Sequence, residues 1–396
     1  MENFFDKFPS PHPFDVQERI SNGFREPYDL SKESRLIFPE KLNKSFKIKT
    51  ALIIGSGHTE GIYHALRNPD ITYTCIDISK KAIDASIKDA NRLKLKNCTF
   101  IHANFLDFNK EFSFDVIYSR NVFQYLPDAV EAFKKCFNLL SDDGAILCTL
   151  ASSYLYEDID YIRDVVLELG YSYNNSEDIN EVINFITGLS GAHPSKSRAF
   201  NNDKILDEKD FISRFMSPVH NSFSIDDLFS TIDASGLFFQ SWYNNNLYYP
   251  SALLRKESSK HPSFYDRINK LDLLKKWDAI CRLLRASNDR YSHTFCLRKK
   301  KELEFYDLKL LNKNSSFVSI RPYQVIKEIQ GRSGYYAASS NYLKKLSEGE
   351  FKFLNYIKKP KTLDSFFKEK ISNINSSDKK NIIQALNEAS IIYLYE

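Results

Sequence analysis

From residue 49 onward the chain alternates short apolar runs with amphipathic segments. Ala51-Leu52-Ile53-Ile54 is an apolar run that ends at a glycine, which is typical of a buried parallel strand. Residues 79–93 carry small and apolar side chains at helical spacing, and Ser79 is suited to cap that helix. Further strands are predicted at 71–76, 98–102, 114–119 and 145–150, helices at 62–67 and 129–140, and a turn at 142–144. This order predicts an α/β fold with a parallel, doubly wound sheet.

The flanking regions follow other patterns. Pro9, Pro11 and Pro13 exclude a helix at those positions. Residues 1–48 are interpreted as an N-terminal lid or extension. Within it, short helices are predicted at 16–24 and 29–38. Residues 49–300 are predicted to form one α/β domain with a helical insertion at about 155–235. The insertion is expected to hold helices at 156–169, 179–187, 208–215 and 224–235 and a loop at 193–203.

The last third of the chain completes the sheet and adds a smaller domain. Strands are predicted at 237–242 and 292–297 on either side of a helix at 271–286. Residues 301–396 are predicted to form a small α+β domain that resembles a winged helix. Its expected strands lie at 303–306, 317–320, 325–329 and 391–395, and its helices at 341–357, 362–370 and 377–387.

Charge and composition exclude several classes of function. The 55 basic and 51 acidic residues of this 396-residue chain give a net charge of +4, which argues against nucleic acid as a partner. The six cysteines show no metal-ligand spacing, so we expect buried thiols in a reducing compartment and no metal. Neither a signal peptide nor an apolar stretch of membrane length is recognised, so a cytoplasmic protein without a membrane partner is expected.

A cofactor pocket is predicted where the first two strands end. Gly55-Ser56-Gly57 directly follows the first strand, where a ligand must approach the backbone closely. Asp77 ends the second strand, 22 residues after Gly55, at an offset where a carboxylate accepts hydrogen bonds from ribose hydroxyls. Alone, the glycines fit a tight turn and the aspartate fits a helix cap. Together they favour a pocket for a nucleotide-type cofactor.

Two more polar segments follow the third and fourth strands. Asn104-Phe105 comes just after residue 102, and Asn121 lies in the segment 119–128. Each segment alone would also fit a plain connection between a strand and a helix. Parallel strands bring these two segments, the glycine loop and Asp77 to one edge of the sheet. Their common position there supports the predicted cofactor pocket.

The stretch 50–150 resembles the class I S-adenosylmethionine-dependent methyltransferases. The resemblance is carried by LIIGSGHTEG, TCIDIS, FIHANFLDF, FDVIYSRNVFQYLPD and LLSDDGAIL. It implies a Rossmann-like, seven-stranded methyltransferase sheet with S-adenosylmethionine as cofactor. Asn104 would then meet the adenine edge and Phe105 would cover the ring. The residues expected to bind the cofactor are Gly55, Ser56, Gly57, Asp77, Ile78, Asn104, Phe105 and Asn121.

A narrower resemblance points to an uncharacterised bacterial branch with a helical insertion and a C-terminal winged-helix-like domain. The chain departs from the family pattern at three places. Ile53 stands where an acid usually contacts the methionine amino group, and Thr59 replaces the third glycine of the loop, with Gly61 two residues later. Asn104 replaces a common aspartate.

The resemblance implies methyl transfer by in-line displacement to an O, N or C acceptor on a small molecule or peptide. Such chemistry needs positioning and, for some acceptors, removal of a proton, so no strict catalytic motif is required and none is found. For each candidate side chain taken alone, a structural role is more common than a catalytic one. A homodimer is also compatible with the sequence. The candidates near the acceptor are Asn121, Gln124, Tyr125, His193, Arg214, His220, Tyr248 and Tyr249.

Two alternatives are kept. An NAD(P)-dependent oxidoreductase would also use a glycine loop and an acid, but the loop here is Gly-x-Gly-x-x-x-Gly, and the spacing Tyr323 to Lys327 falls in the C-terminal domain. A catalytically weak or inactive regulatory protein would keep the cofactor pocket and use the C-terminal domain for recognition.

Overall fold

The computed structural model describes residues 1–8, 15–22, 29–41, 47–201, 204–250, 262–284, 292–322, 324–330, 332–339, 342–369 and 376–396. The predictions that rest on Pro9, Pro11, Pro13, Tyr323 and residues 285–286 lie outside these ranges. The chain divides into two compact units. Unit 1 comprises Met1–Pro27, Ile48–Leu237 and Asp289–His293, and unit 2 comprises Tyr28–Lys47, Phe238–Asn288 and Thr294–Glu396.

The described residues contain a seven-stranded sheet of order β3-β2-β1-β4-β5-β9-β8. Five strands run parallel, and β9 pairs antiparallel with β8, which confirms the predicted α/β class with a seven-stranded, Rossmann-like sheet. The central strand β1 lies between β2 and β4, so Ile54 is in register with both Ile76 and Ser119. The strands are β1 Thr50–Ile54, β2 Thr72–Asp77, β3 Cys98–His102, β4 Phe114–Arg120, β5 Leu140–Ala151, β8 Phe238–Trp242 and β9 Ser292–Arg298.

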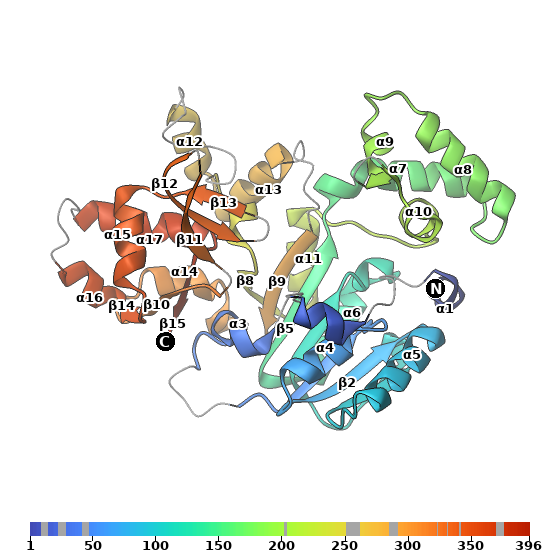
Figure 1. Ribbon diagram of the computed structural model, residues 1–396, viewed down its shortest axis with the longest axis horizontal. Coiled ribbons are helices and arrows are strands. Elements are labelled where there is room, and N and C mark those ends of the chain that lie inside the picture. Colours follow the sequence, from blue (N-terminus) through green and yellow to red (C-terminus); the bar gives the residue numbers. More distant parts are fainter. Residues whose placement is uncertain are drawn as a thin grey trace. The chain divides into compact units, whose positions relative to one another are not determined.

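Helices α4 (Glu60–Arg67), α5 (Lys80–Arg92), α6 (Ala129–Leu139) and α11 (Ile225–Ser235) accompany the parallel strands of unit 1 (Figure 1). The predicted cap at Ser79 is confirmed, since its hydroxyl accepts from the backbone N–H of Ala82. Ser224 forms a capping box at the start of α11. The predicted turn at 142–144 falls within β5, where the register shifts between the pairs Phe114–Leu140 and Val116–Ala145.

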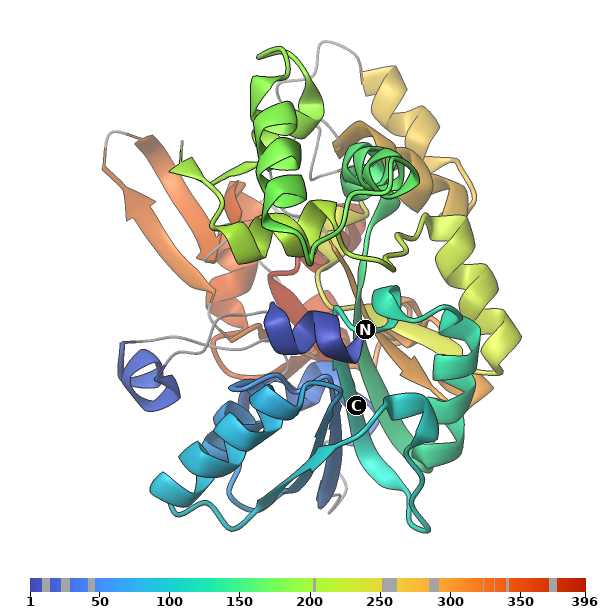
Figure 2. The same ribbon diagram turned by 90° about the vertical axis from the view of Figure 1, so that its right-hand side faces the viewer.

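The insertion packs together with the N-terminal segment of unit 1. Helix α1 (Glu2–Lys7) places Phe4 and Phe8 in one apolar cluster with Ile159 and Phe211 of the insertion. Figure 2 shows α1 (dark blue) between the green insertion helices and the blue and cyan part of the sheet. The elements of the insertion are α7 Ser153–Glu168, α8 Ser176–Gly188, α9 Pro194–Arg198, β6 Phe200–Asn201, β7 Lys204–Ile205 and α10 Glu208–Phe215, and a further short helix near the N-terminus is α2 Val16–Ser21.

The predicted loop at 193–203 is wrong in part. His193 accepts a hydrogen bond from the backbone N–H of Ser195, and Pro194 occupies the first turn, so a short helix forms there.

Unit 2 has two small sheets, β14-β10-β15 and β11-β12-β13, and a core that includes Val318, Phe353, Phe366 and Leu386. Its helices are α3 Leu30–Ile37, α12 Pro262–Asn269, α13 Leu273–Leu284, α14 Tyr306–Leu311, α15 Glu348–Tyr356, α16 Leu363–Lys368 and α17 Ser376–Glu388. Unit 2 also includes β8 and most of β9. Its other strands are β10 Phe317–Ile320, β11 Val325–Ile329, β12 Arg332–Ser339, β13 Tyr342–Lys345, β14 Lys361–Thr362 and β15 Ile392–Tyr395.

Two predictions fail in this region. The expected strand at 303–306 is wrong, because Phe305 takes a left-handed conformation (φ +48°) and α14 starts directly after it. The expected helix at 341–357 is wrong in its first turn. Residues Tyr342–Lys345 pair with β12 as a strand, and the helix begins only after the Ser347–Glu350 capping box.

Candidate functional site

A cavity of about 590 Å³ lies in unit 1 at the carboxyl ends of β1, β2 and β4. Its volume is in the usual range for small-molecule and cofactor sites. Met1 and Phe5 of α1, Tyr156 of α7 and Asp210 of α10 also line it, so the N-terminal helix and the insertion share its wall with the sheet. All of the residues expected to bind a cofactor line this one cavity: Gly55, Ser56, Gly57, Asp77, Ile78, Asn104, Phe105 and Asn121.

The glycine loop has a conformation that only glycine tolerates well. Gly55 and Gly57 have φ values of +66° and +51°. A Cβ atom on Gly55 would lie 2.3 Å from Cγ2 of Val122, so any side chain there would collide with the segment after β4. The loop therefore keeps its backbone close to both the cavity and the fourth strand.

Asp77 joins the loop to the second strand. Its Oδ2 accepts from the backbone N–H of Gly57 and its Oδ1 from that of Ser79, each at 2.8 Å. Burial raises the pKa of Asp77 above its usual value, although these two hydrogen bonds act in the opposite direction. Each carboxylate oxygen keeps a second lone pair, so the side chain can still accept from ligand hydroxyls.

Asn104 and Phe105 form the wall beyond β2. Asn104 caps a single 3₁₀ turn, with its Oδ1 accepting from the backbone N–H of Leu106 at 3.2 Å. Phe105 is buried and stacks on Phe123, with ring centroids 5.6 Å apart. Asn121 has a φ of +56°, a conformation that asparagine tolerates better than most residues.

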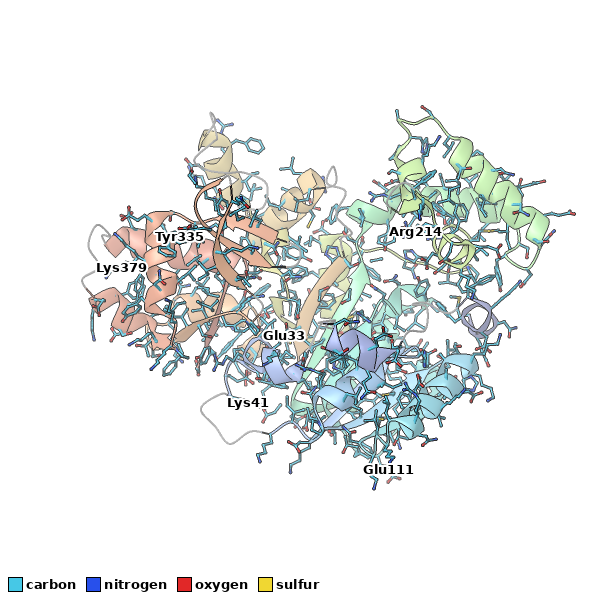
Figure 3. The ribbon with its side chains drawn as sticks, in the orientation of Figure 1. Glu33, Lys41, Glu111, Arg214, Tyr335 and Lys379 are labelled. Atoms are coloured by element: carbon cyan, nitrogen blue, oxygen red, sulfur yellow. The ribbon has the colours of Figure 1, made fainter. Side chains whose placement is uncertain are left out.

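The opposite wall carries hydrogen-bonding side chains. His220 places Nδ1 3.1 Å from Oδ1 of Asp160 and Nε2 3.3 Å from Nε2 of Gln124. Burial would raise the pKa of Asp160, but the hydrogen bonds from His220 and Ser222 and the charge of Arg163 outweigh it and lower the pKa. Gln124, Tyr125, Arg214 and His220 all line the cavity, and Figure 3 shows Arg214 on α10 in the insertion.

The remaining acceptor candidates lie elsewhere. His193 is used as the cap of α9 and does not line the cavity. Tyr248 and Tyr249 are buried in unit 2, where Tyr248 stacks on Trp242.

Sequence reasoning missed a partly buried ion pair in the cavity wall. Nη2 of Arg120, at the end of β4, lies 3.4 Å from Oε2 of Glu60, at the start of α4. Asp160, which holds His220, was missed as well. The available signals were the position of Arg120 directly before Asn121 and the nearness of Glu60 to the glycine loop.

Within the described ranges, no group of three or more His, Cys, Asp or Glu side chains is arranged to hold a metal ion. The helices of those same ranges include none that is long and apolar enough to cross a membrane.

Comparison with known proteins gives the family of this domain. Residues 52–146 match the family model described as a methyltransferase domain. An uncharacterized protein of Rickettsia prowazekii is 31% identical over 120 residues, which cover 30% of this chain and 22% of that protein. Trans-aconitate 2-methyltransferase of Shigella dysenteriae is 29% identical over 138 residues, which cover 35% of this chain and 52% of that enzyme. The chain thus spans about a fifth and about half of the lengths of these two relatives.

Solved structures extend the likeness in fold beyond this domain. PKMT2 from Rickettsia typhi superposes with a TM-score of 0.60 at 12% identity, over 91% of this chain and 74% of that one. Its complex with AdoHcy gives a TM-score of 0.58 at 14% identity over the same shares. At these identities the likeness concerns the fold alone. Residues 52–146 therefore match a methyltransferase domain, which confirms the resemblance of the stretch 50–150 to the class I, S-adenosylmethionine-dependent methyltransferases.

Proposed function

We propose that the chain binds S-adenosylmethionine in the 590 Å³ cavity and transfers its methyl group to an O, N or C atom of a small molecule or peptide. The observation that carries the proposal is that one cavity is lined by the glycine loop, by Asp77, by the segments after β3 and β4, and by the insertion. Cofactor-binding and acceptor-side residues therefore face the same space. An in-line displacement needs that arrangement.

The residues present fit this cofactor. Asp77 is a buried carboxylate with lone pairs left for ribose hydroxyls, and Phe105 offers a buried aromatic wall for a base. The buried Oε1 of Glu60 has no hydrogen-bond partner within the described part of the chain. Because buried polar atoms are normally hydrogen-bonded, this oxygen is suited to accept from a polar ligand in the cavity. When bound, S-adenosylmethionine supplies a methyl group activated by a sulfonium sulfur.

The protein's part in the reaction is to hold the acceptor and to take a proton where the acceptor carries one. Gln124 accepts from the backbone N–H of Ala151 through Oε1 at 3.0 Å, so its Nε2 points as a donor at Nε2 of His220. Nε2 of His220 then carries a lone pair, while Nδ1–H donates to Asp160. We assign His220 the role of proton acceptor once the methyl acceptor takes the place of the Gln124 amide at Nε2, and Asp160 that of a positioning residue.

Titration calorimetry tests the cofactor assignment. The purified chain should bind S-adenosylmethionine saturably, and Asp77→Ala should lower that affinity. Binding of NADH without S-adenosylmethionine would instead support an oxidoreductase and overturn the proposal. Incorporation of a tritiated methyl group into size-separated cell extract would show whether the acceptor is a small molecule or a peptide. Cofactor binding without incorporation into any fraction would favour the regulatory alternative.

Three further assignments stand as proposals. The arrangement of α15, α16 and α17 with the sheet β14-β10-β15 supports a winged-helix-like module in residues 301–396. The six cysteines are all free thiols, which supports a reducing, cytoplasmic location. The net charge of +4 supports a partner other than nucleic acid, and a homodimer remains open.

A further inference from the structure

The proposed function gives no ligand group to the ion pair of Glu60 and Arg120, although both side chains line the cavity. Glu60 is the first residue of α4, directly beyond the glycine loop, and its backbone N–H donates to the carbonyl of Ser56 at 3.3 Å. Arg120 is the last residue of β4. The pair therefore stands beside the glycine loop on the side of the fourth strand.

Glu60 is ionised in spite of its burial. Burial would raise its pKa, but the charge of Arg120 and the neighbouring His64 outweigh that effect, so the pKa of Glu60 lies below its usual value. Oε2 faces Arg120, whereas Oε1 has no hydrogen-bond partner in the described ranges. Its neighbour His64 is 3.9 Å away, which is too long for a hydrogen bond. A buried carboxylate oxygen in this state gains free energy when a ligand donor reaches it.

The order of the strands tells which part of the cofactor arrives here. Asn104 and Phe105 follow β3, Asp77 ends β2, the glycine loop follows β1, and Arg120 ends β4, and these strands are neighbours in that order. Neighbouring strands lie about 4.8 Å apart, so Asp77 and Arg120 stand on either side of β1 about 10 Å from each other. A ligand with its base at Phe105 and its ribose at Asp77 therefore carries its remaining end to Glu60 and Arg120.

That remaining end is an α-amino acid, with one ammonium and one carboxylate group. We propose that Glu60 binds the α-ammonium group through Oε1 and that Arg120 binds the α-carboxylate group of the cofactor. This assignment rests on the proposed function. The two charges of the pair match the two charges of the ligand, and a guanidinium group can hold a carboxylate through two parallel hydrogen bonds. Recognition of the amino-acid end then comes from α4 and β4, while β1 contributes the apolar, buried Ile53.

Calorimetry with two ligands tests the assignment without an acceptor. S-adenosylhomocysteine carries the amino-acid end, and 5′-methylthioadenosine keeps the adenosine and the sulfur but lacks that end. The wild-type chain should bind the first at least about tenfold more tightly than the second, since hydrogen bonds to charged groups are worth that factor or more. Equal affinities in the wild type would overturn the proposal, whereas binding of neither ligand would refute the proposed function itself.

Variants of Glu60 and Arg120 test whether these two residues cause the difference in affinity between the two ligands. Glu60→Gln and Arg120→Met should each weaken S-adenosylhomocysteine binding by about 10- to 100-fold and leave 5′-methylthioadenosine within about twofold. The double variant Glu60→Gln/Arg120→Met removes both charges and leaves no unpaired buried charge. It allows the same test if either single variant fails to fold. Glu111→Gln, an exposed charge change in the same unit, is the matched control and should alter neither affinity (Figure 3). Equal losses for both ligands, or none for S-adenosylhomocysteine, would contradict the assignment.

Discussion

Asp160 and His220 form a partly buried hydrogen-bonded pair across 60 residues of sequence, with 3.1 Å between Oδ1 and Nδ1. Asp160 comes from α7, and His220 lies on the segment that leads from α10 to α11. Arg163 supports both residues, since its guanidinium donates to Oδ1 of Asp160 at 2.7 Å and to the carbonyl of His220 at 3.1 Å. The imidazole is thereby fixed against the cavity wall, with its other nitrogen toward Gln124.

The first prediction concerns the tautomer of His220. Because Asp160 accepts at Nδ1 and Gln124 donates at Nε2, the neutral ring should carry its hydrogen on Nδ1. Nitrogen NMR of histidine-labelled protein measures this directly, with His220→Gln identifying the signal. Gln124→Glu places an acceptor opposite Nε2, so Nε2 should then carry a hydrogen. A neutral ring protonated on Nε2 would contradict the assignment.

The second prediction concerns the role of His220 in methyl transfer. His220→Gln should lower methyl incorporation from tritiated S-adenosylmethionine by about 10²- to 10⁴-fold if the acceptor must lose a proton. The affinity for S-adenosylhomocysteine should stay within about twofold, because the residues that line the cofactor end are not changed. A loss of cofactor affinity that parallels the loss of transfer would instead mean that His220 holds the cavity together.

The third prediction concerns Gly61, which lies where α4 packs on the sheet. A Cβ atom there would lie 2.5 Å from Sγ of Cys75 and 2.9 Å from Cε1 of Phe100. Gly61→Ala gains about 1 kcal/mol of helix propensity. Overpacking of about 1–3 kcal/mol opposes that gain, so a lower free energy of unfolding in urea is expected.

Two further variants control this measurement. Cys75→Ala in the Gly61→Ala background should recover part of the loss, because it removes the nearest atom. Gly188→Ala, at the end of α8, meets nothing within 4 Å and should be neutral or stabilising. If Gly61→Ala has the same free energy of unfolding as Gly188→Ala, close packing against Cys75 and Phe100 does not require glycine at position 61.

The parallel strands could be predicted because each is a short apolar run that ends at a polar or glycine residue. The carboxyl ends of such strands share one edge of a sheet, so Gly55, Asp77 and Asn104 were expected together, and all three line one cavity. Their roles as cofactor ligands stay predictions. Arg120 and Glu60 adjoin the predicted cofactor segments, but their pairing could not be predicted, because no local pattern tells which turn of α4 faces the end of β4.

Local propensity also misled where a tertiary partner decides the structure. Leu303 and Phe305 alternate with polar residues as in a strand, yet the left-handed backbone of Phe305 starts a helix. Tyr342–Lys345 continues the predicted helix in composition, but β12 offers a strand to pair with. The first choice depends on one left-handed backbone conformation, and the second depends on pairing with the preceding strand.

The fourth prediction concerns stability against pH. His293 is fully buried, and its Nε2–H donates to the carbonyl of Phe223 at 2.9 Å. Burial lowers its pKa from 6.5 to about 4, with the hydrogen bond acting weakly in the other direction. Between pH 6.5 and pH 4 the unfolded chain therefore binds a proton that the folded chain does not, so stability falls as the pH falls.

The size of this effect can be measured in urea. From pH 7.5 to pH 5 the histidine should cost about 2 kcal/mol of unfolding free energy. His293→Gln keeps a donor for Phe223 without a titrating group, so its stability should decline less over that interval by about the same amount. Identical pH profiles for the wild type and the variant would show that His293 does not titrate in this way.

The fifth prediction concerns α1 as a cover of the cavity. Phe5 lines the cavity and meets the ring of Tyr125 edge-on at 5.1 Å. Asp6 is held by Ser79, whose hydroxyl donates to Oδ1 at 2.6 Å, and by the backbone N–H of Lys81 at 3.2 Å. Burial opposes the ionisation of Asp6, but these two hydrogen bonds and the charge of Lys81 together outweigh it and lower the pKa of Asp6. The contacts tie α1 to the start of α5.

Asp6→Ala removes both hydrogen bonds, so the closed position of α1 should lose about 1–2 kcal/mol. If α1 must move for the cofactor to leave, S-adenosylhomocysteine should dissociate about tenfold faster in stopped-flow displacement, and Phe5→Ala should act in the same direction. Asp84→Asn changes an exposed charge on the same α5 helix and serves as the control. An unchanged dissociation rate in both α1 variants would mean that the cofactor enters and leaves on the side of the insertion, past Arg214 and His220.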